Sequence, residues 1–130
     1  MILADTSAWI EYLRATESPT HLALRRELRL GSVATTEPVL MEVLLGGRSP
    51  AHVEELEALL ARSTPTPIES EDFRAAARLY RQCRTHGVTI RSSVDCLIGA
   101  VSIRTGLTVL HLDKDFDALG RHTTLTVRSS

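Results

Sequence analysis

The chain has 130 residues and a formal net charge of −1, with 43% hydrophobic and 24% charged residues. These values are ordinary for a globular protein and predict one domain over residues 1–130, with room for a hydrophobic core. No apolar run approaches the length of a membrane span, and no basic segment precedes a long apolar block. We therefore expect no membrane anchor and no secretory leader, and a cytoplasmic protein.

The basic residues are uneven in kind, because Lys114 is the only lysine among 15 lysines and arginines. A genome that prefers GC-rich codons explains this bias. Arginine also grips phosphates with two parallel hydrogen bonds, so a functional reason is open as well. The net charge itself gives no general attraction to nucleic acid, and a phosphate site would need a local patch.

The first half of the chain alternates apolar runs with amphipathic segments. Ser, Thr and Pro at the segment starts are typical of helix caps and first turns, and glycines are typical of helix ends. The expected elements are a strand over 2–5, a helix capped by Thr6 or Ser7, a helix from Ser18-Pro19, a strand near 32–35 and a helix from Thr36 to Gly46-Gly47.

The second half continues this alternation and ends on a strand. The expected elements are a helix over 51–62, an edge strand over 64–68, a long helix ending at Gly87, a helix over 94–105, a strand over 107–112, a short helix over 114–119 and a strand over 124–127. Strands that alternate with helices predict an α/β fold, with four to five mostly parallel strands flanked by helices.

Five carboxylates lie inside or next to the apolar segments. Acids are rarely buried without a partner, and several brought together require a cation. Ligands that are all oxygen favour Mg²⁺, with Mn²⁺ able to substitute, and disfavour zinc. The acids are Asp5 after the first strand, Glu42 within Val39–Leu45, Asp95 before Cys96-Leu97-Ile98, and Asp113 and Asp115 after the strand near 107–112.

Each acid also has a simpler interpretation. Asp5 and Asp113 can cap the helices that follow them, and Asp95 lies where the helix dipole favours any acid. Glu42 can pair with one of the many arginines. Taken together, however, two carboxylates about 5 Å apart repel by roughly 3 kcal/mol at an effective dielectric constant near 20, and a divalent ion reverses that sign. Sites in α/β sheets form beyond the carboxyl ends of the strands, where Asp5 and Asp113 fall.

The residues that bind a substrate are harder to predict from the sequence than the acids. Arg91, Ser92 and Ser93 precede Asp95 and can hold a phosphate at a helix N-terminus, although Arg91 can equally be a solvated loop charge. Lys114 lies between two acids and can neutralise them instead. The low aromatic content argues against a broad platform for stacked bases.

The order of these segments resembles the PIN-domain ribonucleases, and specifically the VapC toxins of bacterial toxin–antitoxin pairs. The matching segments, from near the start to near the end of the chain, are 2–7, 39–44, 93–100 and 110–116. The resemblance implies a three-layer PIN-like fold and a metal-dependent endoribonuclease. It implies catalytic roles for Asp5, Glu42, Asp95 and one or both of Asp113 and Asp115.

Further expectations follow from the same resemblance. Asp5, Asp95 and Asp113 are the expected metal ligands, and Thr6 or Ser7 supports them by hydrogen bonding. The implied substrate is structured RNA such as a tRNA loop, and the implied partner is a VapB antitoxin whose C-terminal segment wraps the toxin. A homodimer, or a heterotetramer or hetero-octamer with the antitoxin, is also implied.

Trp9 and Tyr12 lie on one face of the helix that follows Asp5. Their helical spacing favours packing in the core. The alternative is that the two rings line a groove for a partner peptide.

Two rival functions stay open from the sequence. A doubly wound phosphatase or phosphoacceptor domain would use Asp5 as nucleophile, but haloacid-dehalogenase-like enzymes carry a second Asp two residues later, where this chain has Ser7. A non-catalytic binding module of the same fold would act through protein contacts alone, and its activity would not need Asp5, Glu42 or Asp95.

Overall fold

The computed structural model describes residues 1–130 and contains one five-stranded sheet. The strand order is β3-β2-β1-β4-β5, and every neighbouring pair is parallel. The strands are β1 (Ile2–Ala4), β2 (Val33–Thr35), β3 (Thr64–Pro65), β4 (Thr108–Leu110) and β5 (Val127–Arg128). The expected α/β class is confirmed, with the upper of the two expected strand numbers.

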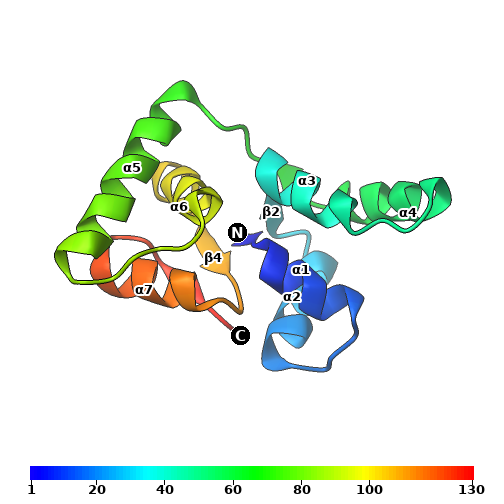
Figure 1. Cartoon of the computed structure of the whole chain (residues 1–130). Helices are drawn as coiled ribbons and strands as arrows, with labels where there is room; N and C mark the ends of the chain where they lie inside the picture. Colours follow the sequence, from blue (N-terminus) through cyan, green and yellow to red (C-terminus); the bar gives the residue numbers. More distant parts are fainter.

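Seven helices flank the sheet. Figure 1 shows α5, α6 and α7 grouped on one side of β4 and the other four helices on the other side. None of the helices combines the length and the apolar character that a membrane crossing needs. The helices are α1 (Thr6–Leu13), α2 (Pro19–Arg29), α3 (Glu37–Leu45), α4 (Pro50–Leu60), α5 (Ser70–Thr85), α6 (Ser93–Thr105) and α7 (Lys114–His122).

The expected elements all occur, but several of their limits differ. Asp5, and not Thr6 or Ser7, caps α1, because its backbone is extended and its carboxylate accepts from the Ser7 amide. Both β4 and β3 are shorter than expected. The last strand is also displaced toward the C-terminus, since Thr123 forms a local turn with Leu125 before Val127 reaches β4.

The sheet brings the ends of β1 and β4 to the same level. Ile2 pairs with Thr108 and Ala4 with Leu110, and the Asp5 amide then donates to the Leu110 carbonyl at 3.0 Å. The strand order reverses direction between β1 and β4, which is the switch point where α/β sheets form their sites. Side chains that follow these two strands are therefore neighbours.

Trp9 is part of the hydrophobic core. Its ring is fully buried and meets the ring of the partly buried Tyr12 edge to face, with centroids 6.1 Å apart. Core packing, the favoured interpretation of these aromatic residues, is confirmed for Trp9, although its buried indole Nε1 has no hydrogen-bond partner. A groove for a partner would have to use other residues of α1.

β3 is the outer strand on its side of the sheet, as its prolines predicted. Pro65 has no N–H to donate and so suits an edge position. The Thr66 amide donates to the Thr35 carbonyl at 2.7 Å and continues the pairing for one residue beyond the strand. This short, proline-containing strand closes the sheet beside α3 and α4.

An ion pair ties the start of α5 to the end of α6. Arg104 donates to both carboxylate oxygens of Asp72, at 2.8 and 2.9 Å, and Asp72 is only 1% exposed. Asp72 also accepts from the Glu69 amide at 2.7 Å. The guanidinium holds the pKa of the Asp72 carboxyl below its ordinary value. Removing Arg104 would leave a buried charge without its main partner.

We expect Arg104→Gln to lower the free energy of unfolding by about 2 kcal/mol, because the buried Asp72 loses charged hydrogen bonds. Arg74→Gln is the matched control, since Arg74 is an exposed arginine on α5 without an ion pair, and its effect should stay within about 0.5 kcal/mol. Urea unfolding followed by circular dichroism measures both. Equal effects of the two substitutions would contradict this role of Arg104.

Candidate functional site

Asp5 occupies the end of β1 and the N-cap of α1 at once. It is 3% exposed, and its Oδ2 accepts from the Ser7 amide at 3.2 Å and from the Ser7 hydroxyl at 2.7 Å. Both interpretations of Asp5 therefore hold together, because the capping bonds use Oδ2 and leave Oδ1 without a hydrogen bond to the protein. A carboxylate fixed in this way has one oxygen free for another ligand.

Ser7 links Asp5 to the segment that follows β4. Its hydroxyl donates to Asp5 and accepts from the Leu112 amide at 2.9 Å, across 105 residues of sequence. Leu112 directly precedes Asp113. The bridge thus sets the position of Asp113 relative to Asp5, which is a more specific supporting role than the sequence indicated for Ser7.

Glu42 reaches the same region from α3. The Thr6 hydroxyl donates to its Oε1 at 2.9 Å, and Glu42 is half-buried. No arginine forms an ion pair with Glu42, so the salt-bridge interpretation is wrong. Thr6 and Ser7, adjacent in sequence, each fix one of two acids on different elements.

Three further acids converge at the N-termini of α6 and α7. Asp95 lies in the first turn of α6, Asp113 caps α7, and Asp115 lies in the first turn of α7. One carboxylate oxygen from each lies within 4.8 Å of the other two. Asp113 Oδ1 accepts from the Asp115 amide at 2.9 Å, so capping accounts for one of its oxygens only. The sequence left open whether one or both of Asp113 and Asp115 belong to the site, and the structure brings both to Asp95.

The charges of all five acids act on one another. Burial, followed in order by the charges of Asp5, Asp113, Asp115 and Glu42, raises the pKa of Asp95 to about 8. Burial likewise raises the pKa of Asp5; hydrogen bonds from Ser7 oppose this, and the charge of Asp113 adds to it. No basic side chain forms an ion pair with any of the five.

His111 supports the site in a way that the sequence did not reveal. The residue is buried, and its Nδ1 accepts from the Asp113 amide at 3.0 Å. Burial lowers its pKa, which favours the neutral ring that this bond requires. Its Nε2 lies 3.6 Å from Asp117. Its position between β4 and Asp113 was the available signal in the sequence.

The expected phosphate-binding residues border the acids. The backbone amide of Arg91, and not its side chain, contacts them by donating to Asp115 Oδ2 at 3.0 Å. Ser92 is the N-cap of α6 but makes no capping bond with its side chain. Ser93 and the side chains of Arg91 and Lys114 are exposed, and Lys114 forms no ion pair with Asp113 or Asp115.

The donor set suits a hard divalent cation. All the converging groups are carboxylates, several keep an oxygen without a hydrogen bond, and their mutual repulsion is unbalanced within the protein. His111 cannot join as a ligand through Nδ1, which the Asp113 amide occupies. Asp95, Asp113 and Asp115 are the residues that could hold an ion directly, with the free oxygen of Asp5 close enough to raise the pKa of Asp95.

A separate groove of about 460 Å³ begins at Thr6 and Glu42 and runs between α1, α3 and α4. Ile10 and Leu13 on α1 are 38% and 43% exposed there. The groove therefore joins an apolar surface to one acid of the cluster.

Comparison with known proteins places the chain in a family. The model of the PIN domain family matches residues 2–122. Over 132 residues the chain is 43% identical to the VapC ribonuclease Mb1587 of Mycobacterium bovis, covering 99% of this chain and 98% of that protein. The ribonuclease VapC11 of Mycobacterium tuberculosis has the same identity and coverage.

Solved structures agree with this placement. The VapBC-5 toxin–antitoxin structure from Mycobacterium tuberculosis is 26% identical, with a TM-score of 0.65 and coverage of 97% of this chain and 95% of that one. VapBC2 from Rickettsia felis, bound to a DNA fragment from its promoter, has a TM-score of 0.77 at 19% identity and covers 98% of each chain. The second likeness shows the fold alone. The chain belongs to the PIN domain family and, within it, to the VapC proteins.

Proposed function

We propose that this VapC protein is a metal-dependent endoribonuclease and the toxin of a type II toxin–antitoxin pair. One observation supports this function most directly: five carboxylates from four separate segments act on one another, and three of them lie within 4.8 Å. The relatives at 43% identity are named ribonucleases, which supports RNA as the substrate. RNA cleavage and the two free cysteines both fit a cytoplasmic protein.

We assign metal binding to Asp5, Asp95 and Asp113, with Asp115 within reach of the same ion. Bound Mg²⁺, or Mn²⁺ in its place, would neutralise the phosphate and lower the pKa of a coordinated water. Asp95 has the strongest need for a cation, because its pKa of about 8 keeps it largely protonated at neutral pH without one. As a ligand of a cation, Asp95 would lose that proton to solvent and act as a carboxylate.

Glu42 is suited to orient the attacking water or to take its proton. Thr6 holds Oε1 at 2.9 Å and leaves Oε2 without a hydrogen bond to the protein. A fixed carboxylate with one free oxygen is the arrangement that general base catalysis requires. Ser7 and His111 would act as positioning residues, because they set Asp5 and the backbone of Asp113 without facing the substrate themselves.

The substrate would approach over the N-terminus of α6. The Arg91 side chain is exposed beside the acids, and the N-cap Ser92 leaves its hydroxyl free of a capping bond. An arginine and a free helix N-terminus attract a phosphate next to the scissile one. Ser93 and Lys114 border the same opening. The net charge of −1 gives no general attraction to RNA, but this local positive charge would. We propose that the substrate is structured RNA such as a tRNA loop.

The partner we propose is a VapB antitoxin. The groove between α1, α3 and α4 offers Ile10 and Leu13 to the apolar face of a peptide and leads it to Glu42. A basic side chain at the end of such a peptide would satisfy the acids and block the ion. The structural neighbours include VapBC structures, which supports an antitoxin as the partner. The assembly we propose is a homodimer, or a heterotetramer or hetero-octamer with the antitoxin.

Asp95→Asn should lower metal-dependent RNA cleavage by at least about a hundredfold, because the substitution removes a ligand of the ion that activates water. Glu54→Gln is the control, since Glu54 is an exposed acid of α4 outside the cluster. Cleavage of a total tRNA pool with Mg²⁺ present, followed on denaturing gels, measures both variants. Full activity of purified Asp95→Asn would exclude the proposed site, and activity lost equally in Glu54→Gln would point to a general structural effect.

The acid cluster should make the metal-free protein less stable as pH rises. Asp95 has a folded pKa of about 8 against an ordinary value of 3.8. Between these values the folded state keeps a proton that the unfolded state has lost, so the free energy of unfolding falls with increasing pH. In EDTA we expect Asp95→Asn to flatten this decline between about pH 4 and pH 8. Urea unfolding at several pH values tests it, and equal slopes in both proteins would contradict it.

A divalent metal ion should offset the repulsion between the clustered carboxylates and so stabilise the folded protein. We expect Mn²⁺ to raise the melting temperature of the native protein, because an ion that binds only the folded state stabilises it. The same concentration should leave the melting temperature of Asp95→Asn nearly unchanged. Scanning calorimetry with Mn²⁺ and with matched Na⁺ provides the measurement. An equal rise in both proteins would place the binding elsewhere.

A further inference from the structure

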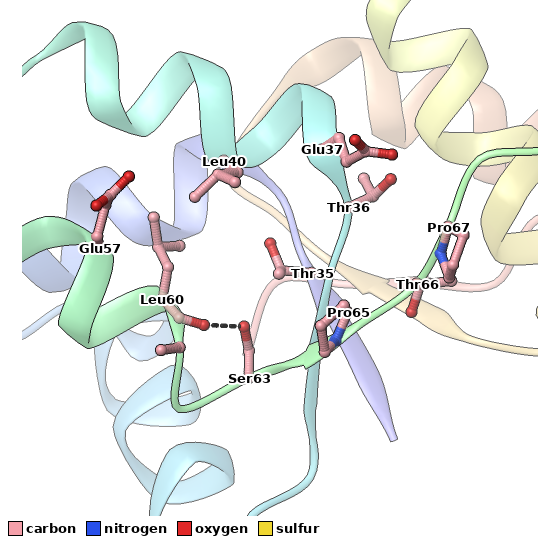
Figure 2. Close-up of a pocket in the computed structure, with 11 residues that line it drawn as sticks. Thr35, Thr36, Glu37, Leu40, Glu57, Leu60, Ser63, Pro65, Thr66 and Pro67 are labelled. Carbon is pink, nitrogen blue, oxygen red and sulfur yellow. Dashed lines mark hydrogen bonds between the residues drawn. The ribbon is translucent and has the colours of Figure 1, made fainter.

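A second cavity lies apart from the acid cluster, between α3, α4 and the segment around β3. Its volume is about 610 Å³, within the range of sites for small ligands. Figure 2 shows Leu40 and Leu60 on its apolar walls, and Pro65 of β3 and the following Pro67 along one side. None of the five acids of the cluster lines it. The cavity has no part in the proposed cleavage of RNA.

Two hydroxyls in this cavity have no partner. Thr35 and Thr36 are 8% and 2% exposed, and neither Oγ1 makes a hydrogen bond. In Figure 2 the Thr35 hydroxyl points into the space between Leu40 and Leu60. Thr36 is the N-cap of α3, yet its hydroxyl forms no capping bond. Figure 2 shows the Thr36 hydroxyl directed away from Leu40 and Leu60, so only the Thr35 hydroxyl faces the space between them. Buried polar groups are nearly always satisfied, so the unpartnered Thr35 hydroxyl indicates a missing partner in this cavity.

The charge of the cavity selects among possible partners. Glu37 and Glu57 are the charged residues that line it, and both are exposed. Figure 2 shows them on opposite sides of Leu40. Neither forms an ion pair. A cavity with two acids, no base and a free hydroxyl oxygen favours a hydrogen-bond donor that carries positive charge.

We propose that this cavity binds a primary alkylammonium group. The ammonium donates to the Thr35 hydroxyl, its aliphatic stem packs between Leu40 and Leu60, and the carboxylates of Glu37 and Glu57 balance its charge. An alkylammonium suits the free hydroxyl, the apolar walls and the two carboxylates, because it is a charged hydrogen-bond donor without an acceptor and has an apolar stem. The group has two possible sources, a free diamine and the side chain of a lysine from a partner protein.

Nuclear magnetic resonance titrations of the whole protein test the proposal. The probes are 1,5-diaminopentane for the free amine, Nα-acetyl-lysinamide for the lysine side chain, and Nα-acetyl-norleucinamide as the uncharged control. We expect saturable shifts of the Leu40 and Thr66 amides with one or both charged probes and none with norleucinamide. Saturation by diaminopentane alone assigns a free amine, and saturation by lysinamide alone assigns a partner's lysine. Equal binding of norleucinamide, or no shift with either charged probe, overturns the proposal.

Substitutions locate the binding. Thr35→Val and Glu57→Gln should each weaken it by about tenfold, whereas Glu54→Gln, an exposed acid of α4 outside the cavity, should not. Asp95→Asn should bind as the native protein does, because the acid cluster is a separate site. Thr35→Val should also fold with unchanged or higher stability, since it removes an unsatisfied hydroxyl. Binding lost only in Asp95→Asn would assign the amine to the acid cluster and refute the cavity.

Discussion

Repulsion between carboxylates is the constraint on which the functional edge of this protein depends. Asp5 and Asp113 follow adjacent parallel strands, and α6 and α3 bring Asp95 and Glu42 to them. The fold gains nothing in stability from this grouping, because burial and like charges raise the pKa of Asp95 to about 8. The rest of the domain must therefore hold the acids together, and the short hydrogen bonds from Thr6 and Ser7 are part of that support.

The sequence predicted the fold class and the acids because both depend on local patterns. An apolar run followed by an acid is visible without coordinates, and the alternation of strands with helices leaves few arrangements open. Asp5 and Asp113 each follow a strand, and the carboxyl ends of parallel strands meet at one edge of the sheet. These two acids could therefore be predicted at one site, and the resemblance to VapC toxins implied Glu42 and Asp95 beside them.

The parts that the sequence missed depend on contacts between distant residues. Ser7 joins Leu112 across 105 residues, and His111 holds Asp113 through a ring nitrogen whose role depends on burial. Arg91 touches the cluster through its backbone, so its side-chain identity gave no signal. The predicted position of β5 was inaccurate, because a strand of two residues has no periodicity that the sequence could show.

The outer strand β3 affects how readily copies of the protein aggregate. An open strand edge can recruit further strands and begin an aggregate. Here Pro65 withholds one donor, and the Thr66 amide is already engaged by Thr35. A newly made chain that meets another one at this edge finds little to pair with, so growth of the sheet beyond five strands is discouraged there. This edge is therefore a poor template for pairing with a strand of another copy.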